Sequence, residues 1–415
     1  MYGQVVTCVR VGTTVGVADV TVTRRTFLTG TAATAAAGAL ATGLSAPASA
    51  LAEDAHAAPV GASDTADAAL DRALARLVRH PDGPPGAAAL VQRGDRAVLH
   101  RAGTADLASG APIRAFDSMR LASVSKAFSG AVALSLVADG TLSLGDTVAK
   151  WLPGLPPAWS KVTLRELLNH TSGIPDYVTP ALIDALNESP LNAPPPRVLL
   201  SYAGTGKNFT PGSKYEYSNS DNILVGLMVE AATGKSYESQ LRGRVFGPLG
   251  LEDTSLPRGA GIPAPFVHGY AVAPPHAPED VTHQFAAGWT WASGGIVSTP
   301  DDANTFIRAY VRGATTSPPV RMAQFKFRPG GSEPPGPGQN SAGLAIFRYR
   351  TTFGTVYGHT GNLPGYTQFL AASANGGRSV VVSVNAQITP TMNLKRFTEL
   401  RRIYTLAVRA ALARQ

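Results

Sequence analysis

The stretch that decides the fold is Leu121–Gly130, LASVSKAFSG, with Ser123 and Lys126 three residues apart at the start of an apolar helix. Residues i and i+3 share one face of a helix, so the Lys126 amine lies beside the Ser123 hydroxyl. A serine hydroxyl is activated when a neighbouring group takes its proton, and lysine does this only with a lowered pKa. Ser123 is therefore a candidate nucleophile and Lys126 its candidate base. Alone, the spacing fits a helix-capping serine beside a solvent-exposed lysine better than it fits a catalytic pair.

A second motif, Tyr217-Ser218-Asn219, stands ahead of a helix predicted over 221–233. A phenol passes protons when a nearby cation such as Lys126 stabilises its phenolate. The Asn219 amide both accepts and donates, which suits it to hold Lys126 on one side and a substrate carbonyl on the other. Ser220-Asp221-Asn222 follows at once and is an alternative second motif, S-D-N. We prefer Tyr217, because the sequence contains no Lys-Thr-Gly to accompany an S-D-N motif.

The third motif is His359-Thr360-Gly361, at the end of a strand predicted over 354–359. Glycine lets a substrate approach the strand edge, and the backbone N–H of Asn362 can join that of Ser123 as an oxyanion hole. His359 is predicted to be a polar group, able to carry a positive charge, beside a substrate carboxylate, with Thr360 as a hydroxyl donor.

In this order, the three motifs resemble the serine beta-lactamase and penicillin-binding superfamily, in its class C-like branch with a tyrosine second motif. The resemblance is closest to secreted D-alanyl-D-alanine carboxypeptidases with a His-Thr-Gly third motif, and it extends from about Gly86 to the C-terminus. It implies an α+β fold, in which an antiparallel β-sheet is flanked by helices and carries an inserted, mostly helical subdomain. It also implies an acyl-enzyme formed by the catalytic residues Ser123, Lys126 and Tyr217.

The resemblance further assigns substrate-binding residues. It places Trp289 against the substrate and Arg348, or Arg350 in another register, at the substrate's terminal carboxylate. Asn219, His359, Thr360, Gly361 and Asn362 complete the predicted substrate-binding set. Asn362 stands where a second threonine is common, which leaves substrate choice open. No cofactor is implied, and β-lactams are expected inhibitors.

Other functions remain open on the same motifs. An esterase or a beta-lactamase has the same fold, although the absence of lysine at position 359 argues against a beta-lactamase. A non-hydrolytic penicillin-binding sensor is the alternative of another class. The absence of a G-x-S-x-G sequence argues against an α/β-hydrolase. The spacing of His268, His276 and His283 fits no metal site.

The first fifty residues are predicted to be an export signal and are set aside from the fold. Arg24-Arg25 precedes an apolar run that ends in Ala48-Ser49-Ala50, so we expect twin-arginine export and cleavage after Ala50. Residues 51–67 are then a flexible lead-in and 68–415 one hydrolase domain. Cys8, the only cysteine, precedes the cleavage site, which excludes disulfides and thiol catalysis from the mature protein. We expect a secreted monomer with no membrane anchor.

Charge and periodicity complete the prediction. The formal net charge of +8 is the one feature of the sequence that favours nucleic-acid binding, and the export signal argues against that function. Apolar spacing predicts helices over 68–78, 300–310 and 392–412, and strands over 86–91, 97–102, 294–298, 354–359, 367–372 and 379–385. Thr163 and Glu166 fit a capping box at the start of a short helix. The segments 256–283 and 328–339 are predicted to be irregular.

Overall fold

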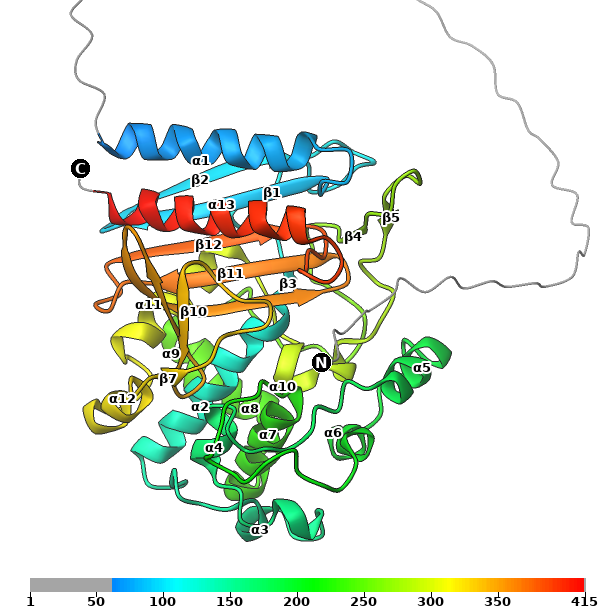
Figure 1. The fold of residues 1–415 in the computed structure, drawn as a ribbon, viewed down its shortest axis with the longest axis vertical. Helices are drawn as coiled ribbons and strands as arrows, with labels where there is room; N and C mark the ends of the chain where they lie inside the picture. Colours follow the sequence, from blue (N-terminus) through cyan, green and yellow to red (C-terminus); the bar gives the residue numbers. More distant parts are fainter. Residues whose placement is uncertain (1–61, 414–415) are drawn as a thin grey trace, which may run out of the picture. The chain divides into compact units, whose positions relative to one another are not determined.

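The computed structural model describes residues 62–413, and its centre is an antiparallel sheet of eight strands in the order β2-β1-β12-β11-β10-β9-β8-β7 (Figure 1). Helices flank this sheet, so the predicted α+β class is confirmed. The strands are β1 (Gly86–Arg93), β2 (Arg96–Gly103), β7 (Arg328–Pro329), β8 (Gln339–Ala342), β9 (Phe347–Thr351), β10 (Gly354–Leu363), β11 (Tyr366–Ala372) and β12 (Arg378–Val384).

The sheet joins the two ends of the described chain. Strand β1 pairs with β12, with Ala87 opposite Val384. Helices α1 (Ala62–Arg79) and α13 (Leu394–Leu412) lie side by side over one face (Figure 1). Each buries an apolar stripe with a spacing of three to four residues, as expected for a helix that covers a sheet. Helix α1 begins at Ala62, so the end of the predicted lead-in, 51–67, is helical.

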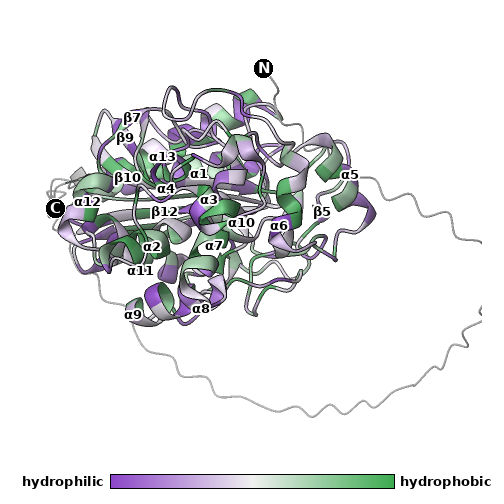
Figure 2. Cartoon of the chain, turned by 90° about the horizontal axis from the view of Figure 1, so that it is seen from below, coloured by the Kyte–Doolittle hydropathy of each residue, from purple (hydrophilic) through white to green (hydrophobic). Residues whose placement is uncertain are grey.

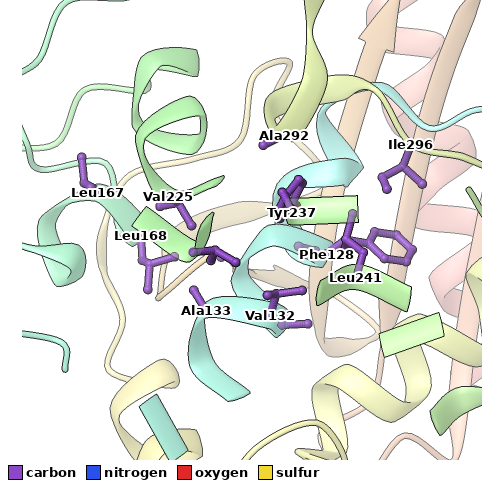
Figure 3. Close-up of a cluster of buried hydrophobic side chains, with 14 of the residues drawn as sticks. Phe128, Val132, Ala133, Leu167, Leu168, Val225, Tyr237, Leu241, Ala292 and Ile296 are labelled. Carbon is purple, nitrogen blue, oxygen red and sulfur yellow. The ribbon is translucent and has the colours of Figure 1, made fainter. Parts of the chain in front are cut away.

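The opposite face of the sheet carries the helical part of the fold, with α2 (Ser125–Ala138) at its centre. This helix is apolar almost all round (Figure 2), which is typical of a buried helix. Phe128 stacks on Phe306 of α11 (Pro300–Arg312), with ring centroids 3.6 Å apart, and side chains from several other helices close the cluster (Figure 3). The other helices are α3 (Val148–Trp151), α4 (Leu164–Leu168), α5 (Pro180–Glu188), α6 (Pro196–Leu199), α7 (Asn219–Thr233), α8 (Tyr237–Leu241), α9 (Gly247–Leu249), α10 (Trp291–Gly294) and α12 (Pro318–Gln324).

Local predictions were correct where the signal was strong. The capping box at α4 is present: the Glu166 backbone N–H donates to Thr163 Oγ1 at 3.3 Å, and the Thr163 N–H to the Glu166 carboxylate at 2.8 Å. The strand predicted over 294–298 is wrong in its first half, because Gly294 ends α10 and only Val297–Ser298 (β6) pairs, with Met119–Arg120 (β3). The segment 256–283, predicted to be irregular, contains the short pair β4 (Tyr270–Ala271) and β5 (Glu279–Asp280).

The predicted export signal, residues 1–50, lies outside the described residues and stays a prediction. Within residues 62–413, no helix combines the length and the apolar character needed to cross a membrane.

Candidate active site

Ser123 lies in a short 3₁₀ turn, Ala122–Val124 (η1), immediately before α2. Its predecessor, Ala122, has φ = 52°, in the left-handed region that a side chain rarely adopts. Such backbone strain persists only when the surrounding structure enforces it. Here β10 crosses directly beside the turn: a Cβ atom on Gly361 would lie 2.9 Å from the Ser123 backbone nitrogen and 2.5 Å from the Leu121 oxygen. The third motif therefore packs against the backbone of the first.

Lys126 is the group in contact with the Ser123 hydroxyl. Its Nζ lies 3.1 Å from Ser123 Oγ, and it also contacts Asn219 Oδ1 and the Ser293 carbonyl oxygen, both at 2.7 Å. Because the side chain is 1% exposed, burial lowers its pKa to about 7, while the charges of Asp176, Asp221 and Glu333 act in the opposite direction. In the neutral amine, the two N–H bonds can be donated to Asn219 and Ser293, which leaves the lone pair for the Ser123 hydroxyl proton.

Tyr217 also faces the Lys126 amine. Its ring centroid is 5.1 Å from Lys126 Nζ, and its buried hydroxyl has no hydrogen-bond partner among the described residues. Burial raises its pKa well above 10, although the nearby Ser123 hydroxyl acts to lower it. The sequence prediction of a phenolate stabilised by Lys126 is therefore not supported. At neutral pH Tyr217 is a phenol, and it can pass on a proton only by donating it first.

The structure also distinguishes between the two candidates for the second motif. Asn219 contacts Lys126, whereas the side chains of Ser220, Asp221 and Asn222 are bonded elsewhere. Ser220 Oγ donates to the Pro175 carbonyl at 2.7 Å, and Asn222 Nδ2 donates to Ser129 Oγ at 2.8 Å. Asp221 is fully buried and pairs with Ser172 and His170. Tyr217-Ser218-Asn219 is thus the motif that faces Ser123.

The third motif lies on β10, where His359 to Leu363 continue beyond the pairing with β9, which ends at Gly358. The Asn362 side chain accepts a hydrogen bond from Gln387 Nε2 at 2.7 Å, so the residue is held in place. The oxyanion role of its backbone N–H stays a prediction. Thr360 is fully buried and its hydroxyl donates to the Pro334 carbonyl at 2.6 Å, so its predicted role as a donor to the substrate is not supported.

His359 is not the cation that the sequence suggested. Burial, and then the charge of Lys126, lower its pKa to about 3, so the ring is neutral at pH 7. Its Nδ1–H donates to the Thr360 carbonyl at 2.5 Å, and its buried Nε2 has no partner among the described residues. The ring packs edge-on against Phe347 at 4.9 Å. Within this site His359 can accept a hydrogen bond but cannot hold a carboxylate by charge.

Two further predicted binding residues point elsewhere. Trp289 is 3% exposed, and its indole N–H donates to the Pro190 carbonyl at 3.1 Å, so it offers no free donor to the substrate. Arg348, on β9, bonds to Ser341 at 3.1 Å and stacks over Phe327 at 4.7 Å. None of these contacts involves Ser123, Lys126 or Tyr217. The carboxylate-binding prediction for Arg348 is therefore not supported.

Sequence reasoning missed two acidic residues that surround Lys126. Asp176 accepts from both the backbone N–H and Nδ2 of Asn219, at 3.2 and 2.8 Å. Glu333 is exposed and lies in a loop fixed on both sides: Ser332 Oγ contacts the Tyr349 hydroxyl at 3.0 Å, and Pro334 accepts from Thr360. Desolvation raises the pKa of both carboxyls, and the charge of Lys126 acts against this. The sequence signal for Asp176 was its place just after the Ser172-Gly173 turn; Glu333 carried none.

Comparison with known proteins agrees with this geometry. The family model described as Beta-lactamase matches residues 74–404. A D-aminopeptidase of Cereibacter sphaeroides is 31% identical to this chain, in a match that covers 49% of this chain and 39% of the aminopeptidase. The esterase EstB of Burkholderia gladioli is 35% identical, in a match that covers 45% of this chain and 50% of the esterase. The solved D-stereospecific amidohydrolase from Streptomyces sp. is 28% identical, with a TM-score of 0.70 over 81% of this chain and 98% of its own. The chain spans half or less of the length of the curated relatives it matches.

Proposed function

Because this chain belongs to the beta-lactamase family and is a serine hydrolase of that fold, we propose that it cleaves the amide bond on the carbonyl side of a D-amino acid residue whose amine is free. The observation that carries the proposal is the buried Lys126 amine, with a pKa of about 7, at 3.1 Å from the Ser123 hydroxyl. A base with a pKa near the working pH is the most effective one.

The reaction follows from the contacts of Lys126. Its neutral amine takes the Ser123 proton as Ser123 Oγ attacks the substrate carbonyl, and the N–H groups of Ser123 and Asn362 stabilise the oxyanion that forms. The Tyr217 phenol then donates its proton to the leaving amine and recovers one from the Lys126 ammonium. The C–N bond breaks and the acyl group stays on Ser123. A water molecule, deprotonated by Lys126, then attacks the ester carbonyl. The C–O bond to Ser123 breaks, the Lys126 ammonium returns the proton to Ser123 Oγ, and the acid is released.

The charges around Ser123 indicate the substrate class. Asp176 and Glu333 bring two carboxyls toward the site, while His359 is neutral and Arg348 is bonded elsewhere. In the part of the chain that the structure describes, Lys126 is the one basic side chain bonded to Ser123 or Asn219. A substrate ammonium fits this balance and would favour the ionised form of both carboxyls. The amidohydrolase and aminopeptidase relatives, by their names, support the same class.

The D-alanyl-D-alanine carboxypeptidase expected from the three motifs is the second candidate. It uses the same acyl-enzyme, and the Tyr217 and His359 motifs favour it. It also needs a cation for the terminal carboxylate of the peptide. His359 is neutral and Arg348 donates to Ser341, which leaves the exposed Arg350 of β9 as the predicted residue that could supply the charge.

The test compares kcat/KM for D-alanine amide, L-alanine amide, an N-acyl-D-alanyl-D-alanine peptide and p-nitrophenyl acetate, with Ser123→Ala as the control for each. We expect ammonia release from D-alanine amide to exceed D-alanine release from the acylated peptide at least tenfold. The reverse order would establish the carboxypeptidase. Hydrolysis of the aryl ester alone would indicate an esterase, and stable acylation by a β-lactam without any turnover a sensor.

A further inference from the structure

Three buried polar side chains meet directly behind Tyr217, and the mechanism above uses none of them. Asp221 accepts a hydrogen bond from Ser172 Oγ on one carboxyl oxygen at 2.6 Å, and its other oxygen lies 2.9 Å from His170 Nδ1. All three side chains are at most 3% exposed. They come from separate parts of the chain, the turn after α4 and the first turn of α7, so this network joins two elements of the helical region.

His170 connects this network to Tyr217. Its ring packs on the Tyr217 ring with centroids 4.5 Å apart, and edge-on against Tyr215 at 6.1 Å. The backbone carbonyl of His170 also accepts from the Glu216 N–H at 3.0 Å. His170 itself has φ = 56°, an unfavourable conformation for a residue with a side chain. The chain on both sides of the Tyr217 phenol is thus held to a strained residue.

The network favours its neutral form. Burial raises the pKa of Asp221 well above its usual range, and burial and the Lys126 charge lower the pKa of His170 well below its own. A protonated Asp221 donates to His170 Nδ1 and still accepts from Ser172 with its other oxygen. The Ser218 N–H, which points at the same His170 nitrogen from 3.5 Å, agrees with a ring that accepts at Nδ1.

We propose that Ser172, Asp221 and His170 form a positioning network that fixes the Tyr217 phenol beside Ser123 and Lys126. Tyr217 has no hydrogen bond of its own to hold it among the described residues, so its position depends on ring packing. The inference rests on the proton-transfer role of Tyr217 in the proposed function, but it does not depend on which substrate the enzyme takes.

The test uses Asp221→Asn and Asp221→Ala with D-alanine amide or the N-acyl-D-alanyl-D-alanine peptide, whichever the wild-type enzyme cleaves faster, because only an amide leaving group needs the Tyr217 proton. Thermal unfolding verifies that each variant is folded. Asparagine reproduces the protonated carboxyl, since its Nδ2 can donate to His170 while its Oδ1 accepts from Ser172. We expect Asp221→Asn to retain at least about one third of kcat, and Asp221→Ala to lose about thirtyfold in kcat with KM within about threefold, the pattern of a misplaced catalytic group. Asn304→Ala is the matched control: Asn304 is also buried and bridges Gln92 and Ser379, and its loss should lower Tm and leave kcat unchanged.

Asp221→Ala with kcat within threefold of wild type would overturn the proposal, and so would an Asp221→Asn variant as impaired as Asp221→Ala. If Asp221→Ala does not fold, Ser172→Ala replaces it, and an unchanged kcat in that variant would equally refute the network, whereas a fall of about threefold or more supports it. Because the amide is chosen by its turnover in the wild-type enzyme, these outcomes are independent of which of the two substrates is the natural one. Tyr217→Phe, measured alongside, reports separately whether Tyr217 has the role on which the network depends.

Discussion

Lys126 should set the pH dependence of the reaction. With a pKa of about 7, about half of the molecules carry the free amine at pH 7, compared with about 3 in 10,000 for a lysine at 10.5. The free amine is the reactive form, so kcat/KM should rise with pH, level off above about pH 8, and be about tenfold lower at pH 6 than on the plateau. Burial thus increases the available base about a thousandfold at pH 7, and it costs the protonated form about 5 kcal/mol.

One charge near Lys126 can be removed to test whether the pH dependence of kcat/KM comes from the titration of Lys126. The carboxylate of Glu333 raises the pKa of Lys126. Glu333→Gln should therefore shift the acidic limb of the profile of kcat/KM against pH to lower pH, by about 0.3 pH unit for an exposed, solvent-screened charge. Glu252→Gln is the matched control, because Glu252 is also exposed and is not among the charges that act on Lys126. The assay is p-nitrophenyl acetate hydrolysis from pH 5 to 9 at constant ionic strength.

A kcat/KM that is constant from pH 5 to 9 would refute a lysine base, since a carboxylate with a lower pKa would then be the base. A Glu333→Gln profile displaced to higher pH would refute it too, as would activity of Lys126→Arg anywhere in this range, because a guanidinium stays protonated there.

Two further changes test the geometry around Ser123. Gly361→Ala places a Cβ atom 2.5 to 3.0 Å from backbone atoms of Leu121, Ser123 and Val124, so it should lower kcat on p-nitrophenyl acetate at least about a hundredfold; Gly206→Ala, which meets open space, is the control, and equal activity of the two variants would refute the packing argument. Tyr217→Phe should reduce kcat for D-alanine amide at least about a hundredfold while Ser220→Ala stays near wild type; the opposite result would restore the S-D-N motif.

The sequence predicted the parts of the site that depend on local spacing. Ser123 and Lys126 are neighbours because three residues make one turn of helix, and the apolar continuation of α2 provides the burial that shifts the Lys126 pKa. Strands β10 to β12 were predicted because each is a short apolar run bounded by glycine turns. Strands β8 and β9, next to the edge strand β7, were missed, because they are short and largely polar and follow a loop rich in glycine and proline.

The predictions that failed concerned the partners and the charge of side chains. Trp289 Nε1 donates to the Pro190 carbonyl and Arg348 Nη2 donates to Ser341 Oγ, and no pattern in the sequence brings those residues together. His359 is neutral because Phe347 and Lys126 lie beside it in space. A motif fixes which residue stands at a position, whereas its protonation depends on burial by residues from other parts of the chain.

The polar groups that the fold leaves unsatisfied bear on how the site works. The Tyr217 hydroxyl and His359 Nε2 are two buried polar atoms that have no partner among the described residues. One is a free donor and the other a free acceptor, and both belong to motifs that face Lys126. Lys126 is the third group. Its neutral amine donates its two N–H bonds to Asn219 and Ser293, which leaves its lone pair for the proton of the Ser123 hydroxyl. The fold therefore holds a base, a proton donor and an acceptor ready for a substrate, and the tyrosine that supplies the donor is held by ring packing and not by a bond that catalysis would have to break.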